Sequence, residues 1–248
     1  MLVCRLFPPP ARTGRPRTHT TKRLFEAVLY LLVTGCQWRA LPTAFPPWKT
    51  VYWHWSRWVA AGIFEKMLRK LRRGERLRIG RKADPSALII DSQSVKASTS
   101  ATEEVGYDAG KKIKGRKRHL LVDSQGNLID VVVHAADIQD RDGAKLVLKR
   151  LVSTVTRVRL IWADGGYRGK LLAWVHDLRK HHRITMRIVE REPGSKGFAV
   201  LPRRWVIERT NAWMVACRRL AREYERCTKN TEAFIRLAMI RLLIRRQK

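Results

Sequence analysis

Cysteine and acidic residues are scarce in this 248-residue sequence, and long apolar runs are missing. The four cysteines are scattered and form no Cys-x-x-Cys pair, which suggests neither a zinc site nor a disulfide framework and fits a reducing compartment. No apolar run approaches the roughly 18 residues of a membrane span, and residues 1–10 lack the pattern of a signal peptide. We therefore expect a cytoplasmic protein without a membrane segment.

The shortage of acids leaves a large excess of positive charge. Lys and Arg number 52 against 21 Asp and Glu, which gives a formal net charge of +31. Such a charge opposes compaction unless a polyanion neutralises it, so the expected partner is nucleic acid. We expect this partner to be double-stranded DNA and the protein to be associated with the nucleoid. The alternative is a merely soluble basic surface, but an excess of this size drives non-specific DNA binding through counterion release.

Residues 1–75 are predicted to form a small helical region. Periodic apolar residues indicate helices over Lys22–Thr34 and about Lys49–Ala61, separated by a proline-rich turn and followed by a shorter third helix. Lys49 and Arg57 lie off the apolar face, as in a helix-turn-helix-like DNA-binding region. The alternative for the tryptophans of this region is that they simply build a small core: Trp38, Trp48, Trp53, Trp55 and Trp58.

Two further segments of the first part are basic and weakly periodic. The stretch Arg69–Pro85 is punctuated by glycine and indicates a linker, which we place at residues 76–86. The segment Thr13–Arg17 resembles a minor-groove arm, with Arg15 and Arg17 as candidate DNA contacts. The alternative for this segment is a flexible tail.

The second part, residues 87–248, changes to an α/β pattern. Short buried strands alternate with helices, which predicts a mixed sheet flanked by helices. Strands are expected at residues 87–91, 119–122, 128–134, 159–163 and 184–189, and helices at residues 142–155, 171–181 and 205–224.

Three acids occupy positions that suit a metal site. Asp91 and Asp164 each end an apolar strand, and sites in open α/β sheets lie beyond the carboxyl ends of strands. Glu208 lies in the last predicted helix on a face shared with Trp205 and Ala212, so its carboxylate is expected to point toward the sheet rather than into water. Three converging carboxylates suit Mg²⁺ or Mn²⁺.

Each acid also has a structural alternative. Asp91 and Asp164 could each belong to an ordinary turn, and Glu208 could form a surface ion pair with Arg204 or Arg209. Taken together in this strand order and in so basic a chain, the acids favour catalysis. Two bound ions can activate a water or a 3′-hydroxyl and stabilise the leaving oxygen during in-line attack at phosphorus.

Other charged residues complete the set of candidates. A basic run beside the predicted hairpin is expected to contact phosphates, although such a run is more often a solvated face: Lys111, Lys112, Lys114, Arg116, Lys117 and Arg118. His119 and His134 are expected to be core histidines rather than ligands. Asp137, Asp140 and Asp142 are expected to cap the following helix, with Asp137 as a candidate for the rim of the site.

The longest motifs of the chain resemble the DDE transposases of bacterial insertion sequences, in the branch named after the fifth numbered insertion sequence. They are TGCQWRALPTAFPPWKTVYWHWSRW, IIDSQSVKA, GYDAGKKIKGRKRHLLVDSQGN, ADGGYRG and LPRRWVIERTNAWMVACRRLAREYE. The resemblance implies a ribonuclease-H-like catalytic domain, binding of terminal inverted repeats, dependence on Mg²⁺, and action as a homodimer or higher assembly.

Carried over residue by residue, the resemblance makes Asp91, Asp164 and Glu208 the catalytic acids. It also matches Arg204, four residues before Glu208, to an arginine of the signature. The tyrosine and lysine of that signature are replaced here by Leu201 and Val215, and Arg218 is positioned one turn later to substitute for the lysine. Arg204 and Arg218 are accordingly candidate DNA contacts.

Three other interpretations stay open at this point. One is a non-catalytic basic nucleic-acid-binding protein whose acids are structural, and a second is a stand-alone nuclease on the same fold. A decayed, inactive transposase is a third, because the chain opens with Met1–Cys4 where relatives carry a longer opening helix.

Overall fold

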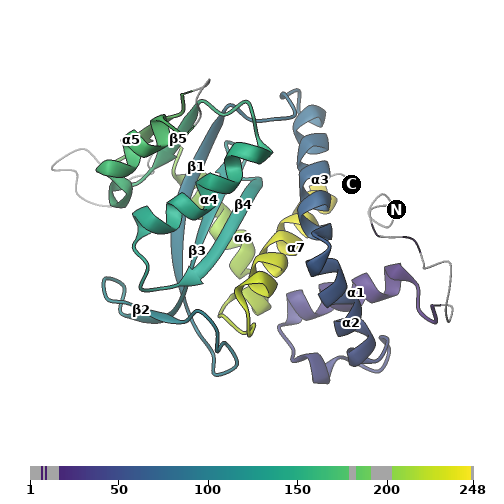
Figure 1. Ribbon diagram of the computed structural model, residues 1–248. Helices are drawn as coiled ribbons and strands as arrows, with labels where there is room; N and C mark the ends of the chain where they lie inside the picture. Colours follow the sequence, from purple (N-terminus) through teal and green to yellow (C-terminus); the bar gives the residue numbers. More distant parts are fainter. Residues whose placement is uncertain (1–6, 8, 10–16, 179–182, 191–202, 247–248) are drawn as a thin grey trace.

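The computed structural model describes residues 7, 9, 17–178, 183–190 and 203–246, and Figure 1 shows their arrangement. A group of helices comes first, and a sheet with helices on both faces follows. The N-terminal elements are α1 (Thr21–Thr34), the 3-10 helix η2 (Trp38–Ala40), α2 (Trp48–Ala60) and α3 (Ile63–Arg78). Among the described residues, no helix is long and apolar enough to cross a membrane.

Helix α1 shows how the local sequence limits these elements. The Thr20 hydroxyl accepts a hydrogen bond from the backbone N–H of Arg23 and caps the first turn. Gly35 ends the helix with φ of 71°, a left-handed conformation that favours glycine. The face of α1 that carries Leu24 and Val28 is buried. The predicted helix is confirmed, and it begins one residue earlier than expected.

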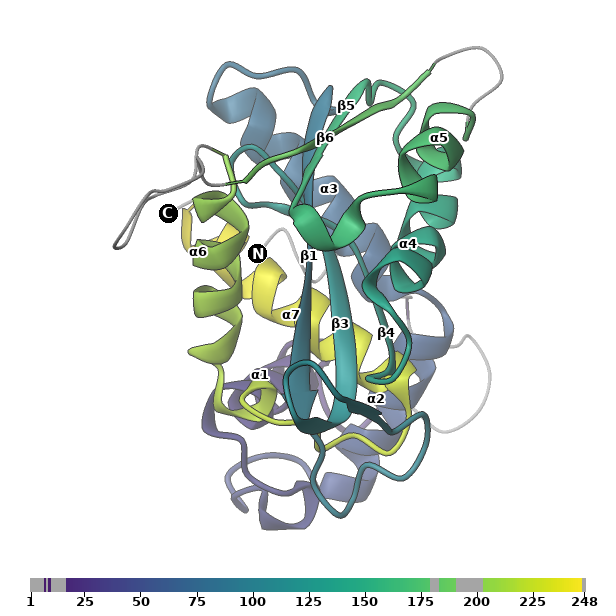
Figure 2. The same cartoon turned by 90° about the vertical axis from the view of Figure 1, so that its left-hand side faces the viewer.

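A six-stranded mixed sheet forms the second part of the chain (Figure 2). Its strands are β1 (Ala87–Lys96), β2 (Gly106–Asp108), β3 (Ile113–Asp123), β4 (Leu128–Ala135), β5 (Leu160–Ala163) and β6 (Thr185–Ile188). Strands β1, β3 and β4 are antiparallel neighbours, whereas β5 lies parallel to β1 and β6 parallel to β5. This sheet order is ribonuclease-H-like, so the predicted fold class is confirmed.

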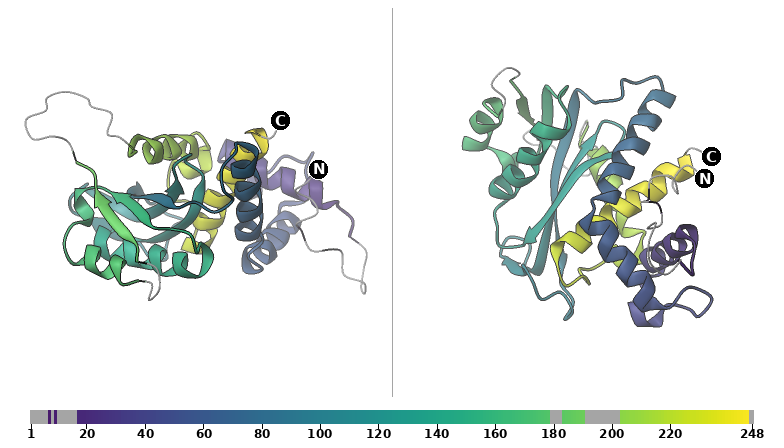
Figure 3. Two further views of the ribbon diagram at one scale, coloured as in Figure 1. Left: turned by 90° about the horizontal axis from the view of Figure 1, so that it is seen from above. Right: turned by 45° about the vertical axis from the view of Figure 1, so that its right-hand side comes forward.

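Helices cover both faces of this sheet (Figure 3). On one face lie α4 (Asp140–Thr154) and α5 (Lys170–His176), and on the other α6 (Trp205–Val215) and α7 (Thr228–Arg246). Side chains alternate along β1: Leu88 and Ile90 pack on the α4 side, whereas Ile89 packs on the α6 side. Asp91 follows Ile89 by two residues and therefore belongs to the face that α6 covers.

The helix predicted for residues 205–224 is shorter in the structure. Helix α6 ends at Val215, and a 3-10 helix, η4 (Arg218–Leu220), follows it. Another 3-10 helix, η3 (Gly165–Tyr167), comes directly after β5. The chain turns at η4 toward the N-terminal helices, where η4 contacts α1, whereas η3 contacts α4.

Helix α7, which the sequence analysis did not predict, joins the N-terminal helices to the sheet. It contacts α1, α2, α3 and β4, and nearly its whole circumference is buried. One hydrophobic cluster extends from Leu24 on α1 through Phe234 on α7 to Ile89 on β1. The helical region and the sheet therefore share a core, and their division into two domains at residues 75 and 87 stays a prediction.

The linker predicted over Arg69–Pro85 is wrong in its first part, because α3 continues to Arg78. Two arginines of this stretch are buried rather than solvated. Arg76 pairs with Asp123 at 2.6 Å, and Arg72 donates to the carbonyl oxygen of Leu128 at 3.3 Å. Each guanidinium finds acceptors on the sheet, which is why a basic, weakly apolar segment can form a packed helix here.

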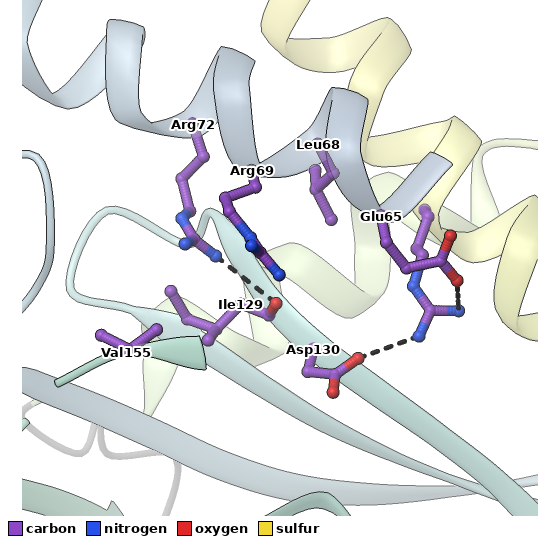
Figure 4. A pocket seen from close by; sticks show the side chains of 8 residues that line it. Glu65, Leu68, Arg69, Arg72, Ile129, Asp130 and Val155 are labelled. Carbon is purple, nitrogen blue, oxygen red and sulfur yellow. Dashed lines mark hydrogen bonds and ion pairs between the residues drawn. The ribbon is translucent and has the colours of Figure 1, made fainter. Parts of the chain in front are cut away.

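Figure 4 shows the small cavity that remains between α3 and β4. Its volume is about 60 Å³, enough for a few water molecules. At one end Arg236 of α7 pairs with Asp130 at 2.9 Å and with Glu65 at 3.4 Å. These ion pairs tie α3, α7 and the sheet together beside the shared core.

Candidate active site

Strand pairing places Asp91 and Asp164 side by side. In the parallel ladder of β1 and β5, Leu88 pairs with Ile161 and Ile89 with Trp162. Continuing the same register by two residues brings Asp91 opposite Asp164. Strand β1 runs on to Lys96 instead of ending at Asp91 as predicted, whereas β5 stops at Ala163. The part of β1 that follows Asp91 is therefore not paired with β5, on the side of the strand where Asp164 lies.

Electrostatics show that the two carboxylates are close. Burial and, second to it, the charge of Asp164 together raise the pKa of Asp91 to about 6. Arg204 and Lys111 oppose this increase without cancelling it. The Asp164 carboxylate accepts a hydrogen bond from the backbone N–H of Gly166 at 2.9 Å, which fixes its orientation after β5.

Helix α6 brings two polar side chains against this pair. Arg204, at the start of the helix, lies 3.6 Å from the Asp164 carboxylate. Asn211 donates a hydrogen bond to Asp91 at 3.4 Å. The spacing of seven residues places Arg204 and Asn211 on one side of the helix, so α6 faces the aspartates with that side.

Glu208 lies between these two residues along the helix, one turn from each. Its side chain is exposed, and its helical neighbours Trp205 and Ala212 are exposed as well. The expectation that Glu208 is turned from water toward the sheet is therefore wrong. The sheet-facing side of α6 is filled by Val206, Ile207, Thr210 and Met214, and this leaves Glu208 at the boundary with solvent.

The aspartate pair fits a hard divalent cation in its donor set and in its charge. Carboxylate oxygens are the ligands that Mg²⁺ and Mn²⁺ prefer, and a cation between Asp91 and Asp164 would remove the repulsion that raises the pKa of Asp91. In the described part of the chain, no three His, Cys, Asp or Glu side chains surround a common point as a metal ion requires. The structure thus brings Asp91 and Asp164 together, and the exposed Glu208 does not complete a three-acid metal cluster with them among the described residues.

A polar network behind the pair was not predicted. Ser92 donates to Asp140 at 2.9 Å, and Lys117 pairs with the same carboxylate at 3.0 Å. Buried Tyr167 lies among the acids, since the charges of Asp91, Asp140 and Asp164 all raise its pKa. Asp140 was expected to cap α4, but it lies in the first turn of that helix, whose N-cap position is Gln139 and has no side-chain cap. The place of Asp140 in the acidic stretch ADIQDRD gave no signal for a contact with Ser92.

The two histidines of the hairpin are core residues, as expected. His119 and His134 are buried, and their rings stack with centres 4.9 Å apart. Burial lowers the pKa of His119 to about 3, so this ring is neutral at physiological pH. Tyr167 lies at hydrogen-bonding distance from His119, 3.3 Å from its Nδ1 atom.

Half of the predicted basic run is not available to DNA. Arg116, Lys117 and Arg118 are buried in β3, so the prediction that they contact phosphates is wrong. Glu223 lies 2.5 Å from Arg118 and 3.5 Å from Arg116, while Lys117 pairs with Asp140. The strand carries these cations into the molecule because buried acids and carbonyl oxygens from distant parts of the chain meet them there.

The remaining candidate cations lie at the surface with one exception. Exposed side chains belong to Arg17, Lys49, Arg57, Lys111, Lys112, Lys114 and Arg218. Lys111 reaches back to the carbonyl oxygen of Ser92 at 3.4 Å, next to Asp91. Arg204 is partly buried beside Asp164. Arg15 lies outside the described residues.

Comparisons with known proteins agree with this architecture. Residues 82–243 match the family described as "Transposase DDE domain", and residues 1–68 match "Putative transposase of IS4/5 family". The uncharacterized protein y4sN of Sinorhizobium fredii is 33% identical over 96 residues, which are 38% of this chain and 70% of that protein. A putative transposase for insertion sequence element IS402 of Burkholderia cepacia is 25% identical over 135 residues, covering 50% of this chain and 60% of the relative.

A solved structure, the Drosophila P element transposase strand transfer complex, aligns with a TM-score of 0.38 and 14% identity over 70% of this chain and 42% of that one. The family match covers well over half of the chain and includes both aspartates and α6. The protein belongs to the DDE transposase family, in its IS4/5 group.

Proposed function

We propose that this protein binds terminal inverted repeats, cleaves DNA at the ends of its element and joins the 3′-hydroxyl to target DNA. The observation that carries the proposal is the Asp91–Asp164 pair on adjacent strands. Two carboxylates that repel each other are an electrostatic cost in any fold, and such costs are concentrated at functional sites. Membership of the DDE transposase family supports the same reaction class.

Two divalent ions, Mg²⁺ or Mn²⁺, are the expected cofactor. When bound, they activate a water or a 3′-hydroxyl and stabilise the leaving oxygen of an in-line displacement. Asp91 and Asp164 would hold them, and we assign Glu208 as the third acid because it lies on α6 between Arg204 and Asn211. Those two side chains orient the aspartates from the helix, Asn211 by its hydrogen bond to Asp91 and Arg204 by its charge next to Asp164.

Exposed cations on both parts of the chain support a DNA path across the molecule. Lys111 lies near Asp91, the exposed Lys112 and Lys114 follow it in the chain, and Lys49 and Arg57 lie on α2. Phosphate contacts of this kind position a duplex without selecting its sequence. Because an insertion sequence has two ends, a homodimer or higher assembly on DNA is part of the proposal.

The decisive experiment combines purified protein, labelled duplexes that carry the element ends, and Mg²⁺. Wild-type protein should produce nicked ends and then joined products, whereas Asp164→Asn should bind the same duplexes and produce neither. Asp177→Asn removes an exposed carboxylate, 79% accessible, and serves as the matched control. Nicks without joined products would indicate a nuclease, and unchanged cleavage by Asp164→Asn would refute the assignment of the site.

A further inference from the structure

Helix α2 carries two opposite stripes of side chains, and one of them is uncovered. The covered stripe packs toward α1, α3 and α7 (Figure 1) and consists of Val51, His54, Trp55 and Trp58. The uncovered stripe repeats the same helical spacing with exposed residues: Lys49, Tyr52, Trp53, Ser56 and Arg57. Its two aromatic side chains are adjacent, with Trp53 54% exposed and Tyr52 41% exposed.

The structure separates the tryptophans that build the core from one that does not. Trp55 is fully buried and stacks on Phe234 with ring centres 4.2 Å apart, and Trp58 is 3% exposed. Trp53 points outward and is the most exposed tryptophan of the described residues. Neighbouring aromatic rings left in water are typical of a surface that binds a partner.

Positive charge surrounds these rings. The guanidinium of Arg57 lies 4.7 Å from the centre of the Trp53 ring. Arg39 and Lys49 lie 5.6 and 5.9 Å from the centre of Trp48, at the beginning of the same helix. Helix α2 itself contains no Asp or Glu. An arginine stacked on an aromatic ring keeps its N–H donors in a fixed plane, ready for a planar acceptor.

Duplex DNA is the partner whose chemistry matches this stripe. The major groove admits an α-helix and presents guanine acceptors to arginine and thymine methyl groups to apolar side chains, while the flanking phosphates meet lysine. A second copy of the chain fits less well, because it would bring the same unpaired cations face to face. Charge complementarity therefore selects DNA.

We infer that the exposed stripe of α2 reads base sequence in the major groove of the terminal repeat, with Trp53 as a specificity-determining contact. The inference rests on the proposed function and deepens it, since it names the helix that distinguishes the ends of the insertion sequence from other DNA. Lys49 and Arg57 alone predict affinity for any duplex. A contact made by the uncharged ring of Trp53, in contrast, affects which DNA sequence is preferred and does not affect how the binding affinity depends on salt.

The test measures dissociation constants at fixed salt for two duplexes of equal length. One carries the terminal repeat that flanks the gene, and the other carries the same bases in scrambled order. Trp53→Ala should lower the ratio of the two affinities about tenfold, as expected for one lost base contact. The slope of log affinity against log salt should stay the same, because no charge is removed.

Two matched variants make the result specific. Trp53→Phe should retain most of the preference, and Leu146→Ala, which truncates a 41% exposed side chain on α4, should change nothing. If Trp53→Ala left the ratio of the two affinities unchanged, the inference would be overturned. The same holds if the only effect of Trp53→Ala were a change in self-association in the absence of DNA. If the wild type itself prefers neither duplex, the proposed end binding fails as well, and that outcome is recognised without any variant.

Discussion

Replacing Asp91 by asparagine is expected to stabilise the metal-free protein while it abolishes DNA cleavage. Asparagine keeps the shape of the side chain and can still accept the hydrogen bond from Asn211, but it removes one of two charges that repel each other. Burial and Asp164 raise the pKa of Asp91 from 3.8 to about 6. The folded protein therefore binds this proton more tightly than the unfolded chain does, and ionisation of Asp91 destabilises the fold.

The size of this destabilisation follows from the difference between the two pKa values of Asp91, 3.8 and about 6. At about 1.4 kcal/mol per unit, ionisation costs up to about 3 kcal/mol, and screening at this partly exposed side chain lowers the figure to about 1–3 kcal/mol. Linkage fixes the sign: between pH 3.8 and about 6 the unfolded chain loses the proton first, so stability falls as pH rises. The gain in folding stability of the Asp91→Asn variant over wild type should be complete above pH 6, decrease below pH 6 and vanish near pH 4.

Thermal unfolding with a chelator present, at pH 4 and at pH 8, measures this difference. For a chain of this length, 1 kcal/mol shifts the midpoint by roughly 2–4 °C. Asp177→Asn, the exposed control, should shift it at neither pH by more than about 0.5 kcal/mol. A variant less stable than wild type at pH 8, or a gain of equal size at both pH values, would refute the reasoning about the aspartate pair.

Three further substitutions test other parts of the structure. Glu208→Gln should reduce Mg²⁺-dependent cleavage of labelled ends more than about 100-fold without changing the thermal midpoint, because its side chain is exposed; full activity would remove it from the site. Glu223→Gln should cost about 3–5 kcal/mol in urea unfolding, since it leaves buried Arg118 unpaired, whereas the exposed Glu103→Gln should cost less than about 1 kcal/mol. Lys111→Gln should weaken binding to every duplex alike and reduce the salt slope by about 1, measured by titration at several salt concentrations.

The strands next to the aspartates could be predicted from the sequence because they are short, apolar and followed by polar turns. Once Ala87–Asp91 and Arg159–Ala163 are taken as parallel neighbours, both acids fall at the same edge of the sheet. Pairing in the structure confirms this register, since Leu88 and Ile161 are opposite each other. The side chain of Glu208 could not be placed in the same way, because helical spacing gives a face but does not say what covers it.

Residues that meet across long stretches of sequence were beyond prediction. Helix α7 is buried between the sheet and the N-terminal helices, so it lacks the one-sided apolar pattern by which surface helices are recognised. Its Glu232 and Arg236 are charged yet buried, because each pairs with a residue from another element. The same reasoning applies to Arg116 and Arg118, whose acceptors include Glu225 and Glu223, more than 100 positions away in the chain. A basic run in a sequence therefore predicts a DNA-binding surface only if the fold brings no buried acids to pair with its cations.

The distribution of charge explains why cations and DNA should bind together at this site. The net charge of +31 favours phosphate over the chain as a whole, yet Asp91 and Asp164 create a local negative potential where, in the proposed reaction, the phosphodiester would approach. Arg204 offsets that potential in part, since the pKa of Asp91 remains raised despite its presence. A phosphate and the two carboxylates repel one another unless divalent charge lies between them. If the proposed function holds, DNA bound near this site should increase its affinity for cations, and bound cations should increase the affinity of the same site for DNA.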